Sequence, residues 1–63
     1  MSRKKIIKKR LSETLISIYQ VAQYVALTQK ELNAWIDGKS KIPYEKTWKI
    51  ADLLNLNPDE LLR

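Results

Sequence analysis

The stretch IYQVAQYVALTQKELNAWIDG, residues 18–38, decides the fold because it holds two short helices on either side of a tight turn. Apolar residues recur at helical spacing both before and after Ala26-Leu27-Thr28. A turn of this length is typical of two consecutive helices that pack against each other. Gly38 ends the second helix, because glycine readily takes the left-handed conformation that follows many helices.

Helix starts in this chain are marked by capping boxes, since neither Gly nor Pro occurs before Gly38. Three boxes are present: SIYQ at 17–20, TQKE at 28–31 and NPDE at 57–60. In each box a short side chain accepts from the free amides of the first turn, and the Glu or Gln three residues on reaches back to the cap. In the last box, Pro58 stands at the favoured first helical position.

All of the expected elements are helices, because no stretch alternates with period two for long enough to form a strand. We expect helices over about 3–14, after Ser17, after Thr28, over about 44–54 with Asn55 as a left-handed cap, and after Asn57. A first helix that continues through Leu15 and Ile16 is the alternative. The residues expected in the core are Ile6, Ile7, Leu11, Val21, Ala22, Val25, Leu32, Trp35, Ile36, Thr47, Trp48, Ile50, Ala51, Leu54, Leu61 and Leu62. The predicted fold is all-α: a compact bundle of about five short helices in one domain, residues 1–63.

The composition argues against several classes of protein. A chain of 63 residues buries little surface. It contains no Cys and no His, which removes disulfides, thiolate metal sites and the commonest general base. Because the carboxylates are scattered as well, we expect no enzyme, no metal, no cofactor and no small-molecule ligand. No apolar run approaches a membrane span or the core of a signal peptide, so we expect no membrane association and a cytoplasmic location.

Positive charge is concentrated at one end of the chain. The net charge is +5, and residues 1–10 carry six cations and no acid, whereas the remainder is nearly balanced. Such a basic segment suits a polyanion such as nucleic acid or an anionic membrane. A solvated tail that keeps a small protein soluble is the alternative interpretation.

Residues 17–62 resemble the helix-turn-helix domain of the lambdoid phage repressor and Cro family. Ala22 stands at the family's small residue, where two helices cross closely, and GKSKIP (38–43) is similar to its Gly-Lys-x-x-x-Pro loop. KIADLLNLNPDELL (49–62) is similar to its last two helices. The resemblance implies a lambda-repressor-like fold and a sequence-specific regulator of transcription, of the repressor type, that binds double-stranded DNA. It also implies that the helix after Thr28 enters the major groove with its N-terminal end first.

Three positions depart from the pattern of that family. Ala26 replaces the usual turn glycine, which requires either a strained backbone or a different turn. Ile18 replaces a glutamine that touches a phosphate in the family. Ile36 replaces a common glutamate, which suggests a more apolar contact beneath the helix.

The helix after Thr28 carries the candidate base contacts. Gln29, Lys30, Asn33 and Ala34 share one arc, opposite the apolar residues of the same helix. Gln and Asn can bond both exposed atoms of the adenine edge, and Lys can donate to guanine. Ala34 leaves room for close approach and suits contact with a thymine methyl. A merely solvated polar face is the alternative.

Candidate phosphate contacts surround that helix. They are the cap and first-turn residues Ser17, Tyr19 and Thr28 and the loop residues Lys39, Ser40 and Lys41. Helix N-termini suit anions because their amides and dipole point outward. The basic run has two interpretations: an arm within residues 1–5 that places Arg3, Lys4 and Lys5 along a groove, or a solvated helix face, as at Lys8, Lys9 and Arg10.

A single copy reads only a few base pairs, so we expect a weak homodimer that is completed on a (pseudo)palindromic site. The C-terminal region is the candidate contact, because so small a core cannot bury Leu53, Leu56 and Leu62 together. For Trp35 and Trp48 we favour core packing over stacking on single-stranded nucleic acid. The alternative function is a small protein-interaction modulator, of antirepressor or antitoxin type, on the same fold.

Overall fold

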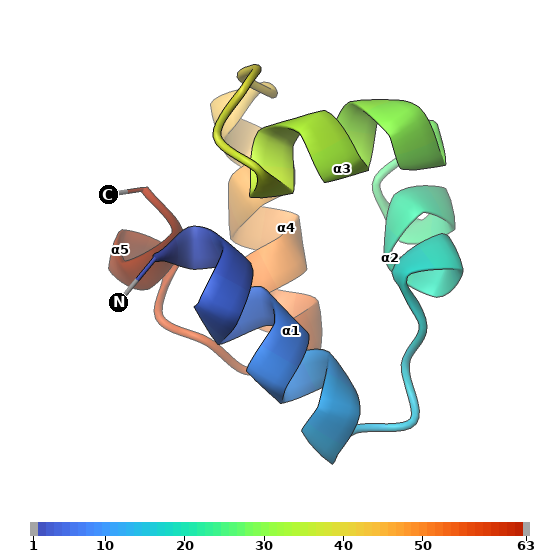
Figure 1. Cartoon of the computed structure of the whole chain (residues 1–63), viewed down its shortest axis with the longest axis vertical. Coiled ribbons are helices and arrows are strands. Elements are labelled where there is room, and N and C mark those ends of the chain that lie inside the picture. Colours follow the sequence, from blue (N-terminus) through green and yellow to red (C-terminus); the bar gives the residue numbers. More distant parts are fainter. Residues whose placement is uncertain (1, 63) are drawn as a thin grey trace.

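The computed structural model describes residues 2–62, and over that range it consists of helices without a strand (Figure 1). The helices are α1 (Arg3–Glu13), α2 (Ile18–Tyr24), α3 (Gln29–Ile36), α4 (Tyr44–Leu54) and α5 (Pro58–Leu61). The all-α prediction with about five short helices is therefore confirmed. Met1, the first residue of the predicted arm, and Arg63, the last of the predicted domain, lie outside the described residues.

Capping boxes set the starts of three helices, as predicted, and the side chain of Ser2 caps α1 by accepting from the Lys5 amide. Ser17, Thr28 and Asn57 are the N-caps of α2, α3 and α5, and each box is complete. α1 ends at Glu13, with Thr14 in extended conformation. The alternative of one helix continuing through Leu15 therefore does not occur.

The turn between α2 and α3 stores backbone strain at one residue. Ala26 has a φ of +57°, in the left-handed region, where a side chain costs about 1–2 kcal/mol. The turn is closed by the Leu27 amide, which donates to the carbonyl oxygen of Ala22 over 2.9 Å. Of the two outcomes expected where alanine replaces glycine, the strained backbone is the one found. Gly38 and Asn55 also take the left-handed conformation that was predicted for them.

One apolar core joins all five helices. Its buried members are Ile7, Val21, Ala22, Val25, Leu32, Trp35, Ile36, Ile50, Ala51, Leu54 and Leu61. α1 packs on α3 and α5, α2 packs on α3, and α4 packs on α5. This packing fixes the orientation of α3, since its whole inner face is held by the core.

Two predicted core residues are exposed instead. Trp48 is 50% exposed and Leu62 is 40% exposed, so both predictions were wrong. Trp48 follows Tyr44 by about one helical turn and shares its outward face, while Ile50 and Leu54 take the inner face of α4. Leu62 follows the end of α5, and only its neighbour Leu61 reaches the core.

The predicted basic arm is wrong for Arg3, Lys4 and Lys5, which form the first turn of α1. Arg3 turns inward and donates to the carbonyl oxygens of Trp35 and Leu61. These carbonyls lie at the ends of α3 and α5, where the regular i+4 donors are missing; the Trp35 carbonyl oxygen also accepts from the Gly38 amide over 3.0 Å. Partial burial lowers the pKa of Arg3 from its ordinary value, yet a guanidinium stays charged in proteins.

Candidate nucleic-acid interface

The outer face of α3 carries free polar side chains. Gln29, Lys30 and Asn33 are exposed, and Ala34 is half-buried at the edge of the face. Within residues 2–62, the three polar side chains take part in none of the hydrogen bonds or ion pairs around them. Because the opposite face of α3 is buried, the backbone that carries these groups is fixed, and the groups themselves remain available to an external partner.

The N-terminal end of α3 is fixed by its capping box. The amide of Thr28 donates to Oε1 of Glu31, and the Thr28 hydroxyl accepts from the Glu31 amide, each over 3.0 Å. The hydrogen bonds from Thr28, with a smaller contribution from the charge of Lys46, hold the pKa of Glu31 below its ordinary value. Lys46 also donates to the carbonyl oxygen of the strained Ala26 over 3.4 Å. These contacts fix the turn from which α3 emerges.

The residues predicted to contact phosphates at the start of α2 are exposed, but each already makes a hydrogen bond within the chain. Ser17 Oγ accepts from the Gln20 amide over 3.2 Å, and the Ser17 amide donates to Oε1 of Gln20 over 2.7 Å. The Tyr19 hydroxyl is exposed with its ring and accepts from Gln23 Nε2 over 2.9 Å. Since both hydroxyls act as acceptors here, each keeps its proton to donate outward.

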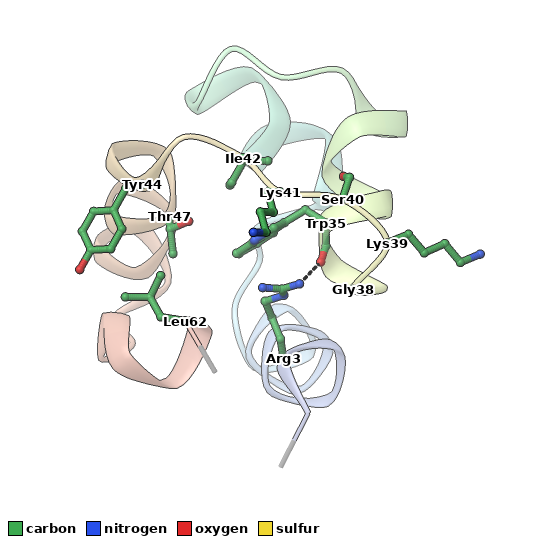
Figure 2. Close-up of a pocket in the computed structure, with 10 residues that line it drawn as sticks. All are labelled: Arg3, Trp35, Gly38, Lys39, Ser40, Lys41, Ile42, Tyr44, Thr47 and Leu62. Atoms are coloured by element: carbon green, nitrogen blue, oxygen red, sulfur yellow. Dashed lines mark hydrogen bonds between the residues drawn. The ribbon is translucent and has the colours of Figure 1, made fainter.

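The loop after α3 places three polar residues at one edge of that helix. Lys39, Ser40 and Lys41 are all exposed. The amide of Lys39 donates to the carbonyl oxygen of Ala34 over 2.8 Å, so the loop is tied back to α3. Figure 2 shows the pocket of about 420 Å³ that this loop shares with Arg3 and Tyr44; in that view Lys39 extends away from the other labelled side chains.

A groove of about 340 Å³ follows the other edge of α3. It is lined by Lys4 and Lys8 of α1, by Ile18 at the start of α2, and by Asn33 and Asp37. Lys4 Nζ lies 3.4 Å from Asp37 Oδ1, at the end of α3. The one-turn spacing of Lys4 and Lys8 is visible in the sequence, but it does not identify α3 as the neighbour of these lysines.

The polar face of α3 therefore lies between two cationic edges. Asn33 lines the groove, whereas Ala34 borders the loop, since its carbonyl oxygen accepts from the Lys39 amide. Of the residues proposed as a basic arm, Lys4 lies at the groove, while the guanidinium of Arg3 is engaged with α3 and α5. Among residues 2–62, no group of three or more His, Cys, Asp or Glu side chains could hold a metal ion.

No protein-family model matches the chain, and neither the curated proteins nor the solved structures contain a significant match to it. In the part of the chain that the structure describes, no helix has both the length and the apolar character needed to cross a membrane.

Proposed function

We propose that this chain is a transcriptional regulator, of the repressor type, that binds double-stranded DNA in a sequence-specific manner. α2 and α3 serve as its helix-turn-helix, and α3 enters the major groove. The observation that carries the proposal is the exposed, unpaired set of Gln29, Lys30 and Asn33 on a helix whose other face is buried. Amide side chains bond the N6 and N7 atoms of adenine, and an ammonium group donates to O6 and N7 of guanine. We also propose that the protein acts in the cytoplasm.

The flanking residues bind phosphates and set the position of α3 without reading sequence. In this proposal Ser17, Tyr19 and Thr28 donate from the start of α2 and from the turn before α3. Lys39, Ser40 and Lys41 donate from the loop. Support comes from the exposure of all six residues and from the amide-rich helix starts beside them.

The test is a selection of duplexes from a random library at moderate salt, followed by alanine variants. Gln29→Ala, Lys30→Ala and Asn33→Ala should each weaken binding to the selected site by roughly 1–3 kcal/mol and relax preference at one base position. Lys9→Ala is the matched control, since Lys9 is exposed on α1 and lies outside the proposed contacts. Failure to enrich any motif, or wild-type binding by all three α3 variants, would falsify the proposal.

We propose in addition that two copies bind one (pseudo)palindromic site. Of the predicted contact residues, Leu53 and Leu56 are half-buried against the core, whereas Leu62 is exposed. Together with Tyr44 and Trp48, Leu62 defines an exposed surface that we call the aromatic patch. Its two rings lie 6.1 Å apart between centroids, tilted by 45°.

A second copy of the chain is the partner that suits the aromatic patch. A two-fold contact brings the same surface together from both copies. Glu45 and Lys49, both exposed, flank Trp48 with opposite charges about one turn apart. Two antiparallel α4 helices would therefore place each Glu45 near the partner copy's lysine. The patch is small, so association is weak in solution and is completed on DNA.

A protein-interaction modulator of antirepressor or antitoxin type is the second candidate function. The aromatic patch is the observation that favours it, because exposed aromatic residues are enriched at protein interfaces. The polar outer face of α3 instead favours the first candidate function, a regulator that binds DNA. Enrichment of a DNA motif in the library selection decides for the regulator, and its absence decides against it.

A further inference from the structure

Four lysines form a row on the outer side of α1. Lys4, Lys5, Lys8 and Lys9 are all exposed, and their spacing places them on one broad arc of the helix. The acid of this helix, Glu13, lies beside Arg10 instead, at 3.9 Å between Oε1 and Nη1. Of the four lysines only Lys4 takes part in an ion pair within residues 2–62, with Asp37, so the row is a strongly positive surface.

The row divides into two halves with different surroundings. Lys4 and Lys8 line the groove that α1 forms with Asn33 and Asp37. Lys9 instead borders a separate hollow, together with Glu60 of α5. Only the first half thus shares a surface with the polar face of α3.

We propose that Lys4 and Lys8 bind the phosphate backbone of duplex DNA along the edge of α3 opposite the 39–41 loop. The inference rests on the proposed function and adds a second phosphate-binding edge to it. A helix in the major groove, which is about 12 Å wide, has a sugar-phosphate strand on each side of it. The loop supplies cations for one strand, and the Lys4–Lys8 edge supplies them for the other.

The other residues of the groove agree with an anionic occupant. Ile18, which follows the candidate phosphate contact Ser17 at the start of α2, also lines the groove. Asn33, one of the candidate base contacts, lines the same groove as Lys8. A phosphate held between these elements would be next to the base pair that Asn33 contacts.

Asp37 has a defined part in this arrangement. It is the acid at the groove, and Lys4 holds its carboxylate at 3.4 Å. A bound phosphate competes with that carboxylate for Lys4 and is repelled by it. Asp37 therefore limits affinity for all duplexes, including non-specific ones.

The experiment compares lysines from the two halves of the row on the selected duplex, with the salt concentration varied. Lys8→Gln keeps much of the side chain and removes its charge, and Lys9→Gln is the matched control. Lys8→Gln should lower the slope of log K against log salt by about 0.9 and weaken binding by several-fold. Lys8→Arg should restore the wild-type slope, and Lys9→Gln should leave it unchanged.

Two further measurements locate the contact. Asp37→Asn should raise affinity several-fold for selected and random duplexes alike. In the second measurement, one phosphate of the duplex at a time is replaced by a neutral methylphosphonate. At one position that flanks the contacted bases, this replacement should weaken binding by the wild type but should not weaken binding by Lys8→Gln any further.

The possible results separate this inference from the proposed function. If the wild type selects a motif but Lys8→Gln binds like wild type, only the Lys4–Lys8 contact is overturned. Equal losses for Lys8→Gln and Lys9→Gln also overturn it, because they indicate diffuse attraction. If the wild type binds no duplex, both proposals are overturned.

Discussion

The guanidinium of Arg3 lies over the ring of Trp35, 4.5 Å from its centroid, and donates to the carbonyl oxygen of the same residue. A second donor of Arg3 reaches the carbonyl oxygen of Leu61 over 3.3 Å. One side chain of α1 thus contacts the ends of both α3 and α5. The position of α3, and of its polar face, depends in part on this arginine.

Replacing Arg3 tests that dependence. Arg3→Ala should lower the free energy of unfolding by about 2 kcal/mol, because it removes hydrogen bonds from a charged donor and a cation–π contact. Lys5→Ala, a neighbouring exposed cation, should change it by less than about 0.5 kcal/mol. Urea unfolding followed by circular dichroism measures both. Equal stabilities for the two variants would show that the Arg3 contacts contribute nothing.

The strained turn predicts a stabilising substitution. Ala26→Gly should raise the free energy of unfolding by about 0.5–1 kcal/mol, since glycine relieves the left-handed strain but gives the unfolded chain more freedom. Ala34→Gly, within α3, should lower it by about 1 kcal/mol. Thermal unfolding of the pair measures effects of opposite sign. A destabilised Ala26→Gly variant would contradict the strain at this turn.

The capping box of α3 predicts a dependence of stability on pH. The pKa of Glu31 in the folded chain lies below its ordinary value of 4.5, mainly because of the Thr28 hydrogen bonds. Its ionised form therefore stabilises the fold above that value, and the contribution is lost as pH falls through the folded pKa. Glu31→Gln retains a capping side chain without the titration. The stability difference between wild type and this variant should shrink as pH falls below 4.5, and a constant difference would contradict the assignment.

The two tryptophans predict different responses to a quencher. Trp35 is 3% exposed, whereas Trp48 is 50% exposed. Iodide should quench the fluorescence of the Trp35→Phe variant, which keeps Trp48, much more than that of Trp48→Phe. The proposed dimer adds a second readout: protection of Trp48 should increase with protein concentration and on binding to a palindromic duplex. If the quenching of Trp48 changes neither with protein concentration nor on binding to the duplex, the aromatic patch is not the dimer contact.

The parts of the fold that the sequence predicted are those set by local chemistry. Ser17, Thr28 and Asn57 bond to residues within three positions of themselves, so a short window contains both partners. The left-handed Asn55 depends in the same way on its own backbone preference. The polar face of α3 could also be predicted from the sequence, because helical periodicity alone separates its residues from those of the core.

The parts that were missed depend on distant partners. Arg3 turns inward because carbonyls 32 and 58 residues away lie beside it. Trp48 stays exposed because no helix among residues 2–62 covers its side of α4, although its spacing fits a core position. Lys8 lies at the candidate site because α1 packs beside α3, which the local sequence does not reveal. None of these partners can be identified from the residues next to them in sequence.

The contact between Arg3 and Leu61 also bears on how the chain folds. It joins residues 58 positions apart, so it forms only after nearly the whole chain has collapsed, whereas α2, its turn and α3 assemble from close neighbours. Interactions that form after the transition state act mainly on the unfolding rate. We therefore expect the Arg3 contacts to set the lifetime of the native state and to leave the speed of folding almost unchanged.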